Sequence, residues 1–338
     1  MRISKFMRTA AASLAALALV TPSLAPAGLF EIPIGQGKAS GAFRVQGENS
    51  FKGVSQVVIG QFTVAYMTKK VDYDGGGFLA TGQEGKSTGY LTGLSPADYQ
   101  RTTDAIFEDF KKQLASHGIS VADPAGLVAD KYYGKTKQEA QGGKVDVTLK
   151  KKDHADALAY WPTQLGRADN ALLNMRMFDT NMANHYTAQY NFARTAKIPV
   201  VNVVYIVDFA KPAKSSGGGL FQDIKVTAGL AMSQFGSQLA LMDTSGKMAK
   251  INLAVPIDES GSFASIRETT SKVAKVARVA SVLGGAFGGF GKIGGSPIGE
   301  MSAKFDFEVT DPAAYGEKAL AAGIKLTDLY VRQLEALR

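Results

Sequence analysis

Two short motifs contain residues that could bind a phosphate or a metal ion, and both are incomplete. Gly85-Lys86-Ser87 matches the end of a phosphate-binding loop, but the glycine required five residues earlier is replaced by Ala80. Asp72-Tyr73-Asp74-Gly75 matches the start of a calcium loop. That loop requires an oxygen ligand and later a glutamate where Gly76 and Gln83 stand. We therefore expect polar turns, with no cofactor and no metal.

Residues for acid–base or thiol catalysis are few and scattered. The three histidines, His117, His154 and His185, are far apart in the sequence, and no two have the spacing of a metal-binding pair. The sequence has no cysteine. We predict that the protein is not an enzyme and has no catalytic residues. A hydrolase with an unfamiliar site is the alternative.

Residues 262–299 have the composition of a contact segment. A helix is expected over Ser262–Leu283, and the glycine-rich segment Gly284–Gly299 follows it. Basic residues on the helix could attract an anionic membrane surface, and aromatic residues after it could insert there or pack against a partner. The candidate contact residues are Lys272, Lys275, Arg278, Phe287, Phe290 and Ile293. The alternative is a surface helix and a glycine loop without a partner.

A second group of residues could line an apolar pocket. Methionine adapts to ligands of irregular shape, and pockets for small molecules are lined mainly by apolar and aromatic side chains. The candidate pocket residues are Trp161, Met175, Met177, Phe178 and Met182. They would make the protein a carrier of a hydrophobic small molecule or lipid. The alternative is that they belong to the ordinary core.

The apolar stretch Ile198–Ala210 (IPVVNVVYIVDFA) is the strongest strand signal. It is rich in Val and Ile and too short to cross a membrane as a helix. Such a run is typical of a strand buried on both faces, so other elements must cover it. A second strand is predicted over Gln56–Met67, where Phe62, Val64 and Tyr66 alternate with other residues.

Two helices have clear start signals. In Ser95-Pro96-Ala97-Asp98, the serine suits the N-cap, the proline suits the first helical position and the aspartate can bond back to the cap. Apolar residues then recur at three- and four-residue spacing until Gly118, which ends the helix. Asp311-Pro312 marks the start of a C-terminal helix in the same way.

The remaining segments complete the expected fold. Val226–Val255 predicts a β-meander with a turn at 243–247, and Met301–Val309 predicts a strand. Asp72–Tyr90 predicts a glycine-rich loop, and residues 125–195 predict an irregular insertion in which Ala155–Trp161 is a possible strand. Together these elements predict one α+β domain over residues 28–338. Its sheet is expected to be mixed or mainly antiparallel and packed by helices, with the meander and the C-terminal helix.

The first 27 residues have the features of a bacterial secretory signal peptide. Arg2, Lys5 and Arg8 precede an apolar run over Ala10–Val20, and Ala25-Pro26-Ala27 is a small-x-small cleavage motif. Removal of this segment lowers the net charge from +8 to +5. We therefore predict a periplasmic or secreted protein. With no cysteine for disulfides, its core alone must stabilise it.

The order of elements resembles the periplasmic domain shared by the curli secretion protein CsgG, the N-terminal part of TolB and the lipoprotein LpoB. The resemblance rests on the strand Val57–Tyr66, the capped helix Ser95–His117 with the strand after it, the D-x-[ST]-G turn at Asp243–Gly246 and the C-terminal helix. It implies a non-catalytic interaction domain of the cell envelope.

We expect an exported, non-catalytic binding or scaffold protein of the bacterial cell envelope. An envelope protein or a second copy of the chain is a better expected partner than a small molecule. An anionic membrane surface is the alternative contact. Nucleic acid is not expected, since an exported chain without a recognisable nucleic-acid motif has no means of meeting or reading it.

Overall fold

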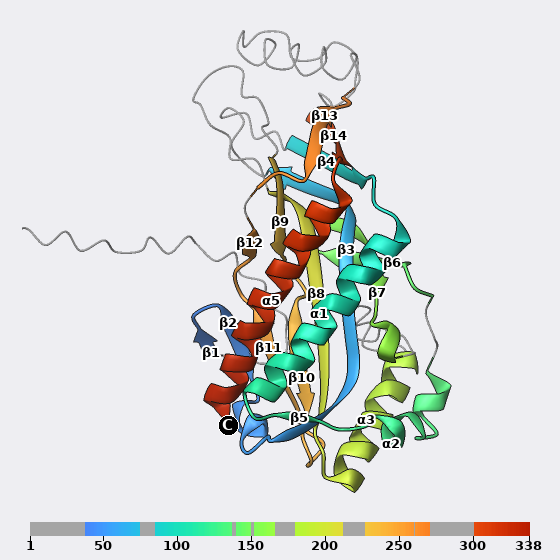
Figure 1. The fold of residues 1–338 in the computed structure, drawn as a ribbon, viewed down its shortest axis with the longest axis vertical. Coiled ribbons are helices and arrows are strands. Elements are labelled where there is room, and N and C mark those ends of the chain that lie inside the picture. Colours follow the sequence, from blue (N-terminus) through green and yellow to red (C-terminus); the bar gives the residue numbers. More distant parts are fainter. Residues whose placement is uncertain are drawn as a thin grey trace, which may run out of the picture. The chain divides into compact units, whose positions relative to one another are not determined.

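Two long parallel strands, β3 (Gln56–Asp74) and β8 (Val200–Lys211), lie side by side in the centre of the sheet (Figure 1). The computed structural model describes residues 38–74, 85–136, 140–149, 152–165, 180–211, 227–259, 261–270 and 301–338. All of these belong to one compact unit, Gly35–Arg338. Every residue from Val200 to Val207 is buried, as expected for a strand covered on both faces.

A β-meander extends the sheet beyond β8, as predicted. Two short strands, β9 and β10, pair antiparallel with successive parts of β8. In the next row β12 pairs with β9 and β11 pairs with β10, and the N-terminal hairpin of β2 and β1 then pairs with β11. At the break in the first row, the Ser237 hydroxyl accepts a hydrogen bond from Ile206 N–H at 3.0 Å, so that backbone group keeps a partner. The strands are β9 (Thr227–Met232), β10 (Gln238–Met242), β11 (Met248–Leu253), β12 (Ile257–Glu259), β2 (Phe43–Gln46) and β1 (Lys38–Ser40).

The other strands belong to the β3 side of the sheet. β7 and β6 form an antiparallel hairpin on one edge of β3, and β5 pairs with its first residues. β4 pairs with its last residues and continues to β14 and β13. The bounds are β4 (Gly85–Thr92), β5 (Ser120–Val121), β6 (Gly143–Thr148), β7 (His154–Tyr160), β13 (Ala264–Glu268) and β14 (Met301–Val309).

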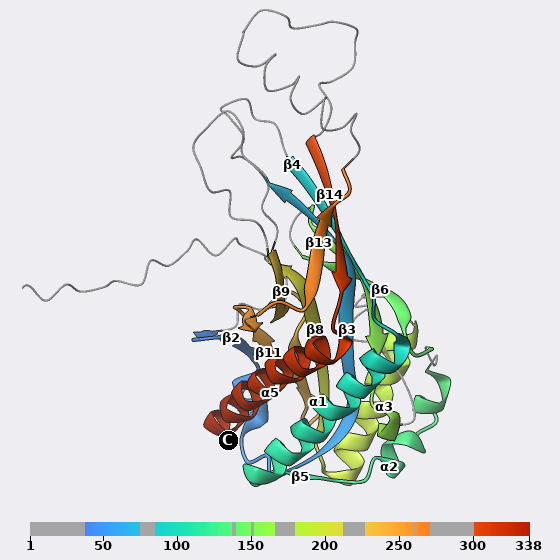
Figure 2. The ribbon, with the colours of Figure 1, turned by 45° about the horizontal axis from the view of Figure 1, so that its top comes forward.

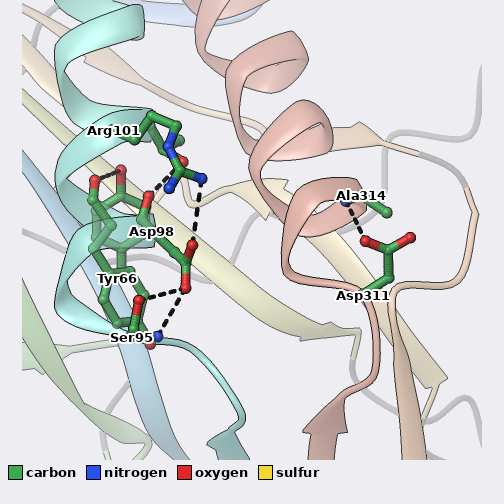
Figure 3. Close-up of polar contacts among 8 residues, drawn as sticks. Tyr66, Ser95, Asp98, Arg101, Asp311 and Ala314 are labelled. Atoms are coloured by element: carbon green, nitrogen blue, oxygen red, sulfur yellow. Dashed lines mark hydrogen bonds and ion pairs between the residues drawn. The ribbon is translucent and has the colours of Figure 1, made fainter.

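Two helices, α1 (Pro96–Ser116) and α5 (Pro312–Leu337), lie side by side on one face of the sheet (Figures 1 and 2). The predicted start signals are confirmed (Figure 3). The Ser95 N–H and hydroxyl both donate to Asp98 Oδ2, at 2.9 and 2.7 Å, and Asp311 Oδ1 accepts from Ala314 N–H at 3.0 Å. These bonds satisfy amide or hydroxyl groups at the helix starts.

Aromatic rings fill the layer between these helices and the sheet. Phe62 of β3 packs against Phe107 and Phe110 of α1 and against Tyr205 of β8, with ring centroids 5.1 to 5.5 Å apart. The Tyr66 hydroxyl lies 3.0 Å from Thr103 Oγ1, so a buried phenol keeps a partner. Burial raises the pKa of the Tyr66 and Tyr205 hydroxyls well above the ordinary value.

The other face of β8 is covered near its start by α3 (Thr180–Ala196). Gln189 of α3 and Asn202 of β8 form a reciprocal amide pair: Gln189 Nε2 donates to Asn202 Oδ1 at 2.8 Å, and Asn202 Nδ2 donates to Gln189 Oε1 at 2.7 Å. Gln189 Nε2 also contacts His185 Nε2. The shorter helices are η1 (Glu48–Phe51), α2 (Ala125–Val128), η3 (Tyr133–Lys135) and η4 (Thr163–Leu165).

The fold class is α+β, as predicted, but three local expectations are wrong. Residues 143–148, expected to be irregular, form β6 because they pair in register with β7, whereas the possible strand at Ala155–Trp161 is confirmed as β7. The expected loop at 72–90 is partly strand, since β3 reaches Asp74 and β4 begins at Gly85. Residues 264–268 form β13 paired with β14, where a helix was expected. In the described residues, no helix is long and apolar enough to cross a membrane.

Candidate functional site

The sheet forks because β3 changes its neighbour along its length. From Val58 to Tyr66 it pairs with β8, and from Lys69 to Asp74 the same edge pairs with β4. β7 occupies the opposite edge over Val64–Val71. β8 continues instead as a hairpin with β9, up to the pair Lys211 and Thr227. Two ribbons therefore diverge, one containing β3, β4, β14 and β13 (Figure 2) and the other β8, β9 and β12.

A buried lysine joins the two ribbons at the fork. Lys70 Nζ of β3 lies 2.6 Å from Asp208 Oδ2 of β8 and donates to the Ala210 carbonyl at 2.9 Å. Asp72 Oδ2 is 3.9 Å from the same ammonium. The side chains of Lys70 and Asp208 are 7% and 15% exposed. Burial alone would lower the pKa of Lys70, but the Asp208 and Asp72 carboxylates outweigh it and raise that pKa, so the ammonium stays charged.

An aromatic pair makes a second contact between the ribbons. Phe209 of β8 meets Phe307 of β14 edge to face, with centroids 5.1 Å apart and planes at 74°. Gly89 of β4 leaves room for both rings, because a Cβ there would lie 2.9 Å from Phe307 and 3.4 Å from Phe209. A charged and an aromatic contact, both buried, therefore join the two ribbons at the forked end.

More exposed ion pairs lie around the fork. Lys69 Nζ is 3.2 Å from Asp156 Oδ2 of β7, and Arg267 Nη2 is 3.4 Å from Asp306 Oδ2 of β14. Their side chains are between 32% and 79% exposed. Water screens such pairs, so they contribute little to stability and serve mainly to keep this surface polar.

Three connections leave the sheet at this end, from strand ends that are neighbours. Residues 75–84 join β3 to β4, residues 212–226 join β8 to β9, and residues 271–300 join β13 to β14. All three lie outside the described residues. In sequence, each contains a glycine run beside apolar and aromatic residues: GGGFLA from Gly75, GGGLF from Gly217 and GGAFGGFGKIGG from Gly284. The topology thus brings the strand ends that flank three segments of similar sequence to one end of the sheet.

The predicted contact residues belong to the third of these connections. Lys272, Lys275, Arg278, Phe287, Phe290 and Ile293 all lie outside the described residues. The described residues on either side are tied together, because Thr269 N–H donates to the Lys304 carbonyl at 2.8 Å and Lys304 N–H donates to Thr270 Oγ1 at 3.0 Å. The connection therefore leaves and returns at one place, beside the fork.

Of the residues predicted to line an apolar pocket, Trp161 is the one whose side chain lies within the described part of the chain. Trp161 follows β7 and is buried, with its carbonyl accepting from Gln100 Nε2 and Gln141 Nε2 at 2.9 Å each. Met182 belongs to α3, and only its backbone is described. Met175, Met177 and Phe178 lie outside the described residues. The predicted apolar pocket therefore stays a prediction.

The residues considered for chemistry are also separated. His117 Nδ1 lies 2.7 Å from Glu335 Oε2 between α1 and α5, His154 begins β7, and His185 belongs to α3. Within the described residues, no three or more His, Cys, Asp or Glu side chains are grouped as a metal site would require.

The triplet Gly85-Lys86-Ser87 lies within a strand. Residues Gly85–Gly89 (GKSTG) also have the G-x-S-x-G spacing of a hydrolase nucleophile. That motif needs a sharp turn between a strand and a helix. These residues instead pair in register with β3 on one side and β14 on the other, along β4. Neither a nucleophile elbow nor a phosphate-binding loop is formed.

The two residues of the charged contact were missed by sequence reasoning. Asp208 interrupts the apolar stretch Ile198–Ala210 near its end, and Lys70 follows an alternating strand. Opposite charges near the ends of two neighbouring buried strands are the signal that could have paired them. Comparison with protein families, curated proteins and solved structures finds no match to this chain. The resemblance to the CsgG, TolB and LpoB domain therefore stays a prediction.

Proposed function

We propose that this chain is an exported, non-catalytic binding or scaffold protein of the bacterial cell envelope, and that it contacts another protein through the forked end of its sheet. The observation that carries the proposal is that the described strand ends flanking three connections, each glycine-rich and phenylalanine-containing in sequence, lie at that end. Their strand ends are fixed by the Lys70–Asp208 and Phe209–Phe307 contacts. The signal-peptide features of residues 1–27 support export.

The strand β13 supports a protein partner over a small molecule. Within the described residues it pairs as a strand only with β14 and lies near β9 without pairing with it, so backbone N–H and C=O groups of its other edge are not used in the sheet. Ser265, Ile266, Arg267 and Glu268 are all exposed, and Ile266 is 39% exposed. An extended segment of a partner can add to such an edge as a further strand. The partner is another envelope protein or a second copy of the chain.

Site-specific photo-crosslinking in the native host tests this proposal. A photoreactive residue is placed at Ile266 of β13 or at Ile324 of α5, which are matched in residue type and in exposure, at 39% and 38%. We expect one discrete crosslinked protein species from position 266 and severalfold less from position 324. Peptide mass spectrometry then distinguishes a second copy of this chain from another protein. Equal crosslinking at both positions, or none at 266, would contradict the proposal.

A membrane contact is the competing outcome, and vesicle flotation detects it. Near an anionic surface, Lys272 and Lys275 would each contribute about 1 kcal/mol, and salt would weaken that contribution. Phe287 and Phe290 would contribute a hydrophobic part that salt leaves unchanged. We expect the wild type not to float with anionic vesicles at low ionic strength. If it floats, and Phe287→Ser with Phe290→Ser abolishes flotation at every salt concentration, the membrane replaces the protein partner.

A further inference from the structure

A polar pocket lies where β3 and β8 begin. Figure 1 shows this as the end of the sheet opposite the fork. It has a volume of about 230 Å³ and is formed by the segment before β3, the α3–β8 connection and the β10–β11 turn. Seven polar side chains line it: Ser50, Lys52, Ser55, Gln56, Lys197, Asp243 and Thr244. Liquid water occupies about 30 Å³ per molecule, so the pocket has room for a small ionic group and several water molecules.

The polar groups of this pocket are mostly unused by the protein. Lys52 and Lys197 are exposed, and no described carboxylate forms an ion pair with either. The side chains of Ser55 and Gln56 make no hydrogen bond within the described residues. The side chain of Thr244, in the β10–β11 turn, likewise makes no hydrogen bond within the described residues. Two positive charges and several hydrogen-bond donors therefore face the pocket without partners among the described residues.

The acidic residue at the pocket, Asp243, is already engaged. Its Oδ1 accepts hydrogen bonds from Ser245 N–H at 2.8 Å, from the Ser245 hydroxyl at 2.7 Å and from Lys247 N–H at 2.8 Å. Burial alone would raise the pKa of Asp243, but hydrogen bonds from Ser50, Ser245 and Lys247 outweigh it and lower that pKa. The carboxylate therefore holds the turn and offsets only one of the two lysine charges.

Lys197 has a backbone conformation that glycine adopts more easily. Its φ is 58°, and it is the one non-glycine residue with positive φ among the described residues. It directly follows α3, as Gly118, with φ 71°, closely follows α1. A left-handed residue after a helix is usually glycine, because a Cβ is strained there. The chain thus places a lysine at a strained position on the rim of a pocket, which is typical of a residue retained for binding.

We propose that this pocket binds a phosphate group, with Lys52 and Lys197 as its charged contacts. A lysine ammonium is a compact point charge with three donors and suits the three oxygens of a phosphate monoester. A carboxylate is better matched by the planar fork of arginine, which the pocket lining lacks. The hydroxyls of Ser55 and Thr244 and the amide of Gln56 supply further hydrogen-bond donors. The phosphate belongs either to a free small molecule or to a lipid headgroup.

Titration of the full chain with inorganic phosphate, followed by calorimetry, tests the assignment. Lys197→Gly removes one ammonium and also the backbone strain. It should lower phosphate affinity by about tenfold or more while raising Tm by about 2 °C. Lys197→Arg keeps both charge and strain, so it should retain binding within about threefold and leave Tm unchanged. Lys112→Ala, on the exposed surface of α1, is the charge control and should change neither quantity.

Three results would overturn the proposal: no phosphate binding by the wild type, undiminished binding by Lys197→Gly, or an equal loss in Lys112→Ala. Vesicles of phosphatidic acid and phosphatidylcholine distinguish the source of the phosphate. Retention on these vesicles that Lys197→Gly abolishes indicates a lipid headgroup, whereas binding of inorganic phosphate alone indicates a free ligand. The pocket and the fork lie at opposite ends of β3, so failure here leaves the proposed function intact.

Discussion

Two buried polar contacts hold β8 to its neighbours, and they differ in charge. At the fork, the Lys70 ammonium and the Asp208 carboxylate, 2.6 Å apart, join β3 to the end of β8. Near the start of the same strand, Gln189 and Asn202 exchange two neutral hydrogen bonds of 2.8 and 2.7 Å between α3 and the sheet. All four residues are largely buried, so neither contact is screened by bulk water.

The difference shows what each contact can do. Coulomb attraction falls off slowly with distance, so an ion pair tolerates small displacements. A reciprocal amide pair requires two short, well-aligned bonds and therefore fixes orientation. The charged contact lies where two ribbons separate, and the neutral contact lies where a helix must keep its register on a sheet. Removing one partner should also cost more stability at the charged contact, because an unpaired buried ion is less favourable than an unpaired buried amide.

The largest effect is expected from a carboxylate placed between the two contacts. Val204 is fully buried on β8. Unlike Asp208, Val204→Asp would have no lysine beside it, and an unpaired buried charge should cost about 3–5 kcal/mol. This is a large part of the roughly 5–15 kcal/mol that stabilises a typical domain. Urea unfolding measures the loss, and Val204→Asn is the uncharged control of the same shape. An unchanged midpoint for Val204→Asp would show that burial of β8 is not essential.

Breaking the charged contact itself should have the next largest effect. Lys70→Met keeps the length of the side chain but leaves Asp208 unpaired, at a cost of about 3 kcal/mol. Adding Asp208→Val should recover most of that loss. Recovery should be incomplete, because Asp208 Oδ1 also accepts from Ala210 N–H at 3.1 Å. Denaturant unfolding of the single and double variants gives the coupling. Additive losses would mean that the two side chains do not interact.

The same variants show how the Lys70–Asp208 contact changes protein stability at alkaline pH. The pKa of Lys70 is raised in the folded protein, so its contribution is complete below the ordinary lysine pKa of about 10.4 and is lost as pH rises through the folded value. Buried tyrosines also lower the stability of the folded protein above about pH 10, because burial raises their pKa and the unfolded state then ionises first. The difference between the wild type and the Lys70→Met, Asp208→Val protein isolates the lysine part. That difference should shrink only above about pH 10.4.

The sequence predicts the parts of the fold that local chemistry determines. The Ser95–Asp98 cap, the alternation of β3 and the apolar run of β8 each appear where expected. Strand partners are less predictable, because they depend on residues distant in the chain. Residues 264–268 look helical beside a basic helix-like segment, yet pairing with β14 makes them a strand. β6 was missed for the same reason: Ala155–Trp161 is visible as a possible strand, but the partner that pairs with it is not.

The two ends of the sheet were not predictable to the same degree. The glycine-rich segment after β13 is visible in the sequence. That its flanking strands end beside those of two other glycine-rich connections follows only from the order of β3, β4, β8 and β14. The charged pair Lys70–Asp208 is 138 residues apart in sequence. The pocket at the other end collects residues from three separate segments, and the left-handed φ of Lys197 has no sequence signal, because lysine is common after helices.

The smallest effect separates the neutral contact from the charged one. Asn202→Val, which suits a strand, leaves the Gln189 amide without its partner on β8 and should cost about 1–3 kcal/mol. Adding Gln189→Met should recover most of it, since both amides are then replaced by apolar groups. Gln189 Nε2 also contacts His185 Nε2, so some loss should remain. Urea unfolding should give a smaller coupling than for Lys70 and Asp208, with no change between pH 8 and about pH 11, because neither amide titrates. A coupling equal to the charged pair's would mean that geometry, and not charge, sets the cost of breaking a buried contact in this sheet.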